Sequence, residues 1–208
     1  MSARMLLSVR LMMLVGAMLG NFVTAQATTV VPPEFTELVN GSDYVVRAKV
    51  LSLTYETRVQ EGQTLIFTRI EFETIEVIAG APPSPLVLTM LGGKFGDTEM
   101  TVAGAPQFRV GEEDILFVEG NGRNFHPLYA VMHGRYPVQR EPDTNREYIT
   151  RSNGVPLADV AEVVLPMAEG PMAAMLRQRQ SPATALTPEE FVTQIKQTRA
   201  GESTSNAK

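Results

Sequence analysis

The sequence contains no cysteine and no tryptophan among its 208 residues. Without cysteine, the chain forms no disulfide, no thiolate metal site and no lipid-modified N-terminal cysteine. Its fold must therefore depend on an apolar core, which a domain of this length is large enough to supply.

Histidine is also scarce, since only His126 and His133 are present. Their spacing matches no helical zinc motif, and the HExxH and GxSxG patterns are both absent. The enzymatic alternative is a metal-assisted hydrolase, in which both imidazoles and a carboxylate would meet across a hairpin. Because no other catalytic constellation is recognisable, we expect a protein that is not an enzyme and that holds no cofactor and no metal.

Basic residues are outnumbered, with 18 Lys and Arg against 23 Asp and Glu. Without residues 1–27, which hold two arginines and no acid, 16 basic residues face 23 acidic ones and the net charge becomes −7. Nucleic acids and anionic membranes bind clustered Lys and Arg, so neither is an expected partner. The acidic run Glu112-Glu113-Asp114 lacks the ligand spacing of a calcium loop and predicts a charged turn.

A long hydrophobic run is missing too, but residues 1–27 have the layout of a secretory signal peptide. Arg4 and Arg10 precede the apolar run 11–19, and Ala25-Gln26-Ala27 forms an A-x-A cleavage site. That run is far shorter than the ~20 apolar residues that a membrane-spanning helix needs. We therefore expect cleavage before Thr28, no stable membrane insertion afterwards, and an exported protein in the periplasm or outside a bacterial cell.

Most of the remaining chain has the pattern of short β-strands separated by Gly, Pro and Asn. Apolar residues occupy even positions from Tyr44 to Val50 and odd positions from Leu51 to Val59, so one strand changes its buried face and needs a bulge near Val50. Glu61-Gly62-Gln63 predicts a hairpin turn. Further strands are expected at 65–78, 86–91, 114–119, 128–132, 135–138 and 147–150, with a short one around 100–102.

Helices are expected near both ends of the mature chain. Pro32-Pro33 and the apolar positions of 34–39 predict a short N-terminal helix. Residues 171–180 are a second candidate, and the capping box Thr187-Pro188-Glu189-Glu190 begins a helix to about Arg199. The predicted organisation is a mainly β fold with a small antiparallel OB-like β-barrel over residues 28–153, a C-terminal helical appendix over 154–199 and a disordered tail over 200–208.

Several segments carry a resemblance to known proteins, namely Ser42–Val50, Ile75–Gly80, Gly92-Gly93, Gly104–Phe108 and Val110–Val118. Between Phe35 and Val138 the chain resembles exported bacterial proteins of uncharacterised role. Their domain is similar to the five-stranded OB barrel of tissue inhibitors of metalloproteinases (TIMP) and netrin modules. The resemblance implies a barrel, but the inhibitor's N-terminal cysteine, which chelates the target zinc, has no counterpart here, and no functional residue carries over.

The function expected from these observations is that of an exported, non-enzymatic binding module for a protein or a polymer of the cell envelope. The expected contact surface lies around Gly92, Gly93, Phe95 and Phe108, where glycines and exposed rings could meet a partner. In the alternative for the two phenylalanines, both are core residues beneath a long loop. The functional alternatives are the metal-assisted hydrolase and a metalloprotease inhibitor that acts through a loop.

Overall fold

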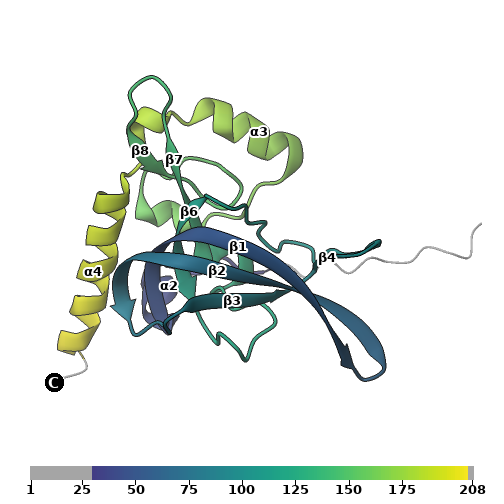
Figure 1. Cartoon of the computed structure of the whole chain (residues 1–208). Helices are drawn as coiled ribbons and strands as arrows, with labels where there is room; N and C mark the ends of the chain where they lie inside the picture. Colours follow the sequence, from purple (N-terminus) through teal and green to yellow (C-terminus); the bar gives the residue numbers. More distant parts are fainter. Residues whose placement is uncertain (1–29, 206–208) are drawn as a thin grey trace, which may run out of the picture.

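The computed structural model describes residues 30–205, so the predicted signal peptide lies outside the described residues. The chain is mainly β, as predicted. Its main sheet is antiparallel, with strand order β3-β2-β1-β6-β7-β8, and a separate small hairpin consists of β4 and β5 (Figure 1). The strands are β1 (Tyr44–Gln60), β2 (Gln63–Gly80), β3 (Leu86–Leu91), β4 (Gly93–Phe95), β5 (Thr98–Met100), β6 (Glu113–Val118), β7 (Arg135–Arg140) and β8 (Glu147–Ile149).

Helices lie before and after the strands. The α-helices are α2 (Phe35–Gly41), α3 (Gly170–Arg179) and α4 (Pro188–Ser205), and the short 3-10 helices are η1 (Val131–Gly134), η2 (Val160–Val164) and η3 (Pro182–Thr184). The predicted N-terminal helix and the C-terminal helical segments are therefore present. Within the described part of the chain, no helix is both long and apolar enough to cross a membrane.

β1 is one long strand that serves two parts of the sheet. Over Tyr44–Lys49 it pairs with both β2 and β6, and over residues 52–60 it continues its ladder with β2. The register with β2 shifts between Val50 and Ser52, which makes Leu51 the extra residue of a bulge. The predicted bulge is confirmed, and because of it Val50 and Leu53 contact the same hydrophobic cluster.

The hairpin that joins β1 to β2 projects from the body of the molecule as an arm (Figure 1). Gln60 pairs with Gln63, so only Glu61 and Gly62 form the turn. Both turn residues have positive φ, 50° and 77°, as in the type I′ turns whose twist suits two adjoining strands. The predicted hairpin turn is therefore confirmed.

The sheet is buried on both faces where β1 begins. One face packs against α2, α4 and η2 through a cluster that includes Val45, Ile115, Phe117, Phe35, Leu38, Phe191 and Ile195. The other face is enclosed by the curled sheet and includes Val46, Ile70, Phe72, Leu88 and Leu116. Alternate residues of a strand point to opposite faces, so Tyr44–Val46 and Ile115–Val118 are apolar at every position.

α4 is fixed at its start by the predicted capping box. The hydroxyl of Thr187 accepts a hydrogen bond from the backbone N–H of Glu190 (3.2 Å), and the Glu190 carboxylate accepts one from the backbone N–H of Thr187 (2.8 Å). Further along, the ring of Phe191 packs against Tyr136, with ring centroids 5.0 Å apart. These contacts hold the helix against the sheet.

α4 also extends further than predicted. The guanidinium of Arg199 donates hydrogen bonds to the backbone carbonyls of Val39 (2.7 Å) and Asn40 (3.1 Å) in the last turn of α2. The helix continues from there to Ser205, so much of the segment expected to be disordered is helical. Residues 206–208 lie outside the described residues.

The sheet is not a closed barrel, and this part of the prediction is wrong. β3 and β8 are the two edge strands of the sheet, and among residues 30–205 no ladder joins them to each other. The loop that follows β6 covers the edge of β3. Asn121 donates to the Val87 carbonyl (2.9 Å), and the N–H of Leu91 donates to the Phe125 carbonyl (2.9 Å).

The prediction of a strand at 128–132 is also wrong. Leu128 forms an isolated bridge with Val118, after which Ala130 and Val131 have φ of 47° and 55° and turn the chain into η1. Gly134 permits this tight return, since a Cβ there would lie 2.7 Å from the backbone nitrogen of Tyr129. A continuous strand is therefore impossible here.

Candidate functional site

A cleft of about 180 Å³ lies between the β1–β2 arm and residues 92–108. The buried residues that line it are apolar and include Ile70, Met90 and Phe108, whereas Thr68, Lys94, Glu99 and Gln107 supply polar groups. Sites for small molecules usually measure about 300–1,000 Å³. The cleft therefore matches a single protein side chain or a single sugar unit better than a cofactor.

Gly92 and Gly93 bring the backbone of β4 close to the arm. The carbonyl of Gly92 accepts a hydrogen bond from the Thr68 hydroxyl (2.7 Å). Gly93 has φ of 133°, and a Cβ there would lie 2.5 Å from the Thr68 oxygen and 2.8 Å from the ring of Tyr55. No side chain fits at this position, so both predicted glycines line the cleft through their backbone.

The two phenylalanines of the predicted site are in different environments. Phe108 is buried and packs edge-on against Phe72 with ring centroids 5.7 Å apart, beneath the guanidinium of Arg135 at 4.2 Å from the ring centre. The expectation that Phe108 is exposed is therefore wrong, and the core alternative holds for it. Phe95 is 49% exposed, so the core interpretation is wrong for it; it is next to Lys94 in β4 but does not itself line the cleft.

A buried ion-pair network supports one wall of the cleft. The guanidinium of Arg135 donates to Asp114 (2.7 Å), to Glu112 (2.8 Å) and to the backbone carbonyl of Gln107. Asp114 is fully buried, so the prediction of a charged turn is wrong for this residue. Loss of solvation raises the pKa of Asp114 to about 6, and the charge of Arg135 opposes the rise. The network fixes the backbone that carries Gln107 and Phe108.

A wider groove of about 540 Å³ lies on the other side of residues 104–109, toward β7, β8 and α3. Its three arginines and Glu112 have partners within the protein. Arg109 pairs with Glu112 at 3.3 Å, Arg135 belongs to the buried network, and Arg177 donates to the backbone carbonyl of Asn153. These groups hold the fold together, and we therefore place the candidate site in the smaller cleft.

The two histidines do not form a metal site. Both ring nitrogens of His126 are buried without a protein hydrogen-bond partner, and burial lowers its pKa. Loss of solvation, together with the nearby charge of Arg151, lowers the pKa of His133 to about 4. Across the described residues, no three His, Asp or Glu side chains gather closely enough to hold an ion. The site that the metal-assisted hydrolase requires is therefore not formed in this part of the chain.

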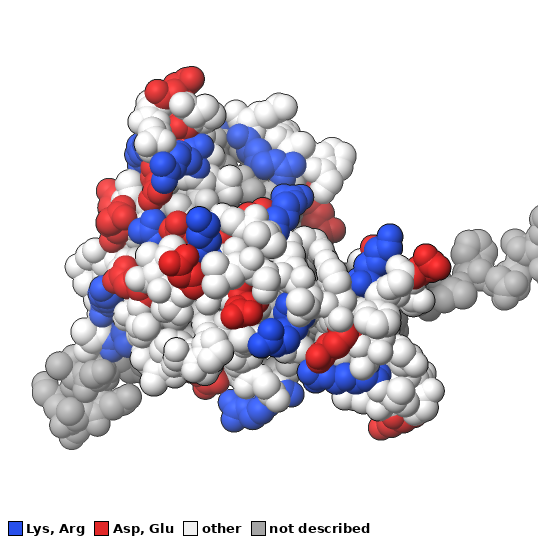
Figure 2. All heavy atoms as spheres, in the orientation of Figure 1, with Lys and Arg blue, Asp and Glu red and all other residues white. Residues whose placement is uncertain are grey.

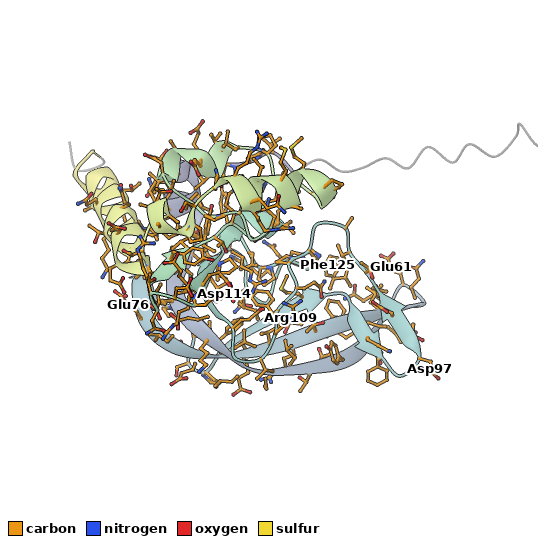
Figure 3. All side chains as sticks on the ribbon, turned by 90° about the horizontal axis from the view of Figure 1, so that it is seen from above. Glu61, Glu76, Asp97, Arg109, Asp114 and Phe125 are labelled. Atoms are coloured by element: carbon orange, nitrogen blue, oxygen red, sulfur yellow. The ribbon has the colours of Figure 1, made fainter. Side chains whose placement is uncertain are left out.

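The cleft is lined by residues of two hairpins, the β1–β2 arm and β4–β5. Figure 3 shows Glu61 at the tip of the arm and Asp97 at the tip of the β4–β5 hairpin at the same end, away from Glu76 and α4. Acidic and basic side chains are interspersed over the face drawn in Figure 2. Tyr55 and Val59, which lie on the cleft side of the arm, are 44% and 74% exposed.

The candidate site is the cleft together with the exposed apolar side chains beside it, which are Tyr55, Val59 and Phe95. Sequence reasoning identified the two glycines and Phe95. It missed Tyr55 and Val59, although their place in the odd-numbered apolar run beyond the bulge was the available signal. No protein-family model matches this chain, and no curated protein is similar to it.

Proposed function

We propose that this chain is an exported, non-enzymatic binding module that holds a segment of an envelope protein in the cleft. The observation that carries the proposal is a concave site flanked by exposed apolar side chains on two projecting hairpins. Scattered apolar residues are ordinary on a surface, but a group beside a concave site is typical of an interaction surface.

The apolar buried lining of the cleft favours a protein segment over a polysaccharide. This lining suits one hydrophobic anchor side chain, and the polar groups of the cleft suit the backbone on either side of that anchor. The arm and the β4–β5 hairpin would then contact the flanking residues of the segment through Tyr55 and Phe95.

The proposal includes an OB-like relationship for the sheet, although the sheet is open. OB domains bind their ligands on the face of strands 2 and 3 and through the loop between strands 1 and 2. In this chain, β2 contributes Thr68 and Ile70 to the cleft, β3 contributes Met90, and the turn between β1 and β2 projects beside it. This agreement in position supports the proposal.

A pair of matched substitutions tests the proposed function. Phe95→Ser removes an exposed ring beside the cleft, and Met172→Ser removes a similarly exposed apolar side chain on α3 (49% and 55% exposed). Full-length chain is immobilised, exposed to envelope extract, and the captured proteins are quantified by mass spectrometry. We expect Phe95→Ser to lose most of a captured protein that Met172→Ser retains.

Equal capture by both variants would contradict the proposed site, and capture of polysaccharide instead of protein would contradict the proposed class of partner. The alternative of a metalloprotease inhibitor makes a separate prediction. In that case the chain would slow the turnover of a secreted metalloprotease, and unchanged turnover across a panel of such enzymes would exclude it.

A further inference from the structure

The outer edge of β1 has a partner along only part of its length. Over Tyr44–Lys49 this edge pairs with β6, and Val50 exchanges backbone hydrogen bonds with Gly111 (2.9 Å) and Glu112 (2.8 Å). Beyond the bulge, residues 52–60 form backbone hydrogen bonds with β2 and with no other segment between residues 30 and 205. An edge of this kind, with free N–H and C=O groups, is a template for another strand.

The turn at the tip of the arm determines which backbone groups face outward. Gln60 and Gln63 flank a two-residue turn, so their backbone groups bond to each other. Antiparallel pairing alternates, and the even-numbered residues from Gln60 back along β1 therefore direct their backbone groups toward β2. The residues whose N–H and C=O groups consequently face solvent are Tyr55, Thr57 and Val59.

The charges on this edge select one register for a second copy of the chain. Glu56 and Arg58 share a face of the strand, where Arg58 donates to Glu56 of the same chain (2.8 Å), and their side chains are 42% and 49% exposed, so each can also reach a second copy. If Thr57 lies opposite the Thr57 of the second copy, each Glu56 lies opposite the partner's Arg58. Pairings centred on Tyr55 or on Val59, the other residues whose backbone groups face outward, place Glu56 and Arg58 opposite uncharged residues and form no such ion pair.

The same register also pairs the apolar side chains of the edge. It places Tyr55 opposite the partner's Val59, twice by symmetry, and pairs of an aromatic and a β-branched residue stabilise antiparallel strands. The turn at Glu61 of the second copy would then lie opposite Leu53. Pairing therefore ends before it reaches the bulge.

We propose that two copies of this chain associate through the outer edge of β1 in antiparallel register, with Thr57 opposite Thr57, so that the two sheets become continuous. The interface is twofold symmetric and self-complementary, as in most dimers. Backbone hydrogen bonds supply the attraction, and the pairs of Glu56 with Arg58 set the register. The dimer does not require a ligand in the cleft, but it uses two side chains of the candidate site, Tyr55 and Val59.

Because the chain lacks cysteine, single cysteines can report this register directly. In Thr57→Cys the two Cα atoms would be about 5.5 Å apart, within the ~4.4–6.8 Å range of disulfides. Thr54→Cys, at another exposed position, is the control. In the proposed register residue 54 lies opposite Gln60 of the second copy, six positions away from the residue 54 of that copy, so the two Cα atoms of residue 54 would be about 20 Å apart. We expect mild oxidation of the full-length chain to give a disulfide-linked dimer for Thr57→Cys and none for Thr54→Cys. No dimer with Thr57→Cys, or equal amounts with both, would overturn the proposal.

Charge reversal provides a second test by sedimentation equilibrium. Glu56→Arg and Arg58→Glu each turn two attractive pairs into repulsive ones, and each should weaken dimerisation by about tenfold. The double variant E56R/R58E exchanges the charges and should restore the wild-type affinity, while thermal unfolding verifies that all variants are folded. A wild-type chain that is monomeric at every concentration, or a double variant as weak as the single ones, would overturn the proposal.

Discussion

Replacement of Arg135 by methionine tests the buried network beside the cleft. The change removes the cation that donates to both oxygens of Asp114 (2.7 and 3.3 Å) and leaves that carboxylate fully buried without its charge partner. Removal of one member of a buried ion pair typically costs about 3–5 kcal/mol. We expect Arg135→Met to lower the free energy of unfolding by about this amount near pH 8, where Asp114 is ionised in the wild type.

The loss should depend on pH in a defined direction. Burial already raises the pKa of Asp114 from 3.8 to about 6, and removal of Arg135 takes away the charge that opposes this rise. A folded-state pKa above the unfolded value means that the folded protein binds the proton more tightly, so stability falls as the pH rises through the folded pKa. Near pH 5 Asp114 is largely protonated in both proteins, and the variant should therefore be much closer to the wild type.

Urea unfolding followed by circular dichroism at the two pH values measures both effects. Arg109→Met is the matched control, because the side chain of Arg109 is 83% exposed and pairs with Glu112 at 3.3 Å. An exposed pair of this kind contributes less than about 1 kcal/mol. A loss in Arg135→Met that is no larger than in the control, or that is equal at both pH values, would refute the reasoning.

Three further predictions concern separate features. The pKa of the buried His133 imidazole is lowered to about 4, so the folded state binds the proton less tightly than the unfolded state, and the wild type loses stability as the pH falls from about 6.5 to 4. His133→Asn should reduce this loss by up to about 3 kcal/mol. Urea unfolding at both ends of the interval measures the loss, and an unchanged loss would contradict the prediction. Gly93→Ala should lower the thermal stability more than Gly96→Ala, since both positions have positive φ but only at Gly93 does a Cβ meet other atoms below 3 Å; equal melting temperatures would count against the close approach. Thr187→Ala removes the N-cap of α4 and should cost about 1 kcal/mol in chemical unfolding, whereas no measurable cost would show that the cap is dispensable.

The features that the sequence predicted well are those with local causes. The change from even to odd apolar positions at Val50 and Leu51 required a bulge whatever the strand pairs with. Gly62 readily adopts the positive φ that the second residue of the two-residue turn needs. The capping box at Thr187 likewise depends only on residues within one helical turn. Each of these elements was therefore found at its predicted place.

The features that the sequence did not predict depend on partners far apart in the chain. Phe95 and Phe108 lie only 13 positions apart and are chemically identical, but Phe95 ends β4 with an exposed ring, whereas Phe108 lies over Phe72 and under Arg135. The ion pair of Asp114 with Arg135 joins β6 to β7. The sequence around each of the two residues looks no different from the sequence around a charged surface residue. The prediction of a closed barrel was wrong for the same reason, since the sequence pattern of a strand does not show which other strand it pairs with.

The bulge at Leu51 divides β1 into two parts that should differ in hydrogen exchange. Amides from Tyr44 to Val50 lie in the centre of a sheet that is covered on both faces, so they should exchange with deuterium only when the whole domain unfolds. Amides of residues 52–60 lie on an open edge of the sheet, which narrows to a two-stranded ribbon from Thr57 onward, and should exchange through small local openings. One strand thus combines a rigid anchor with a deformable end, and the arm can change its twist while the rest of the domain keeps its shape.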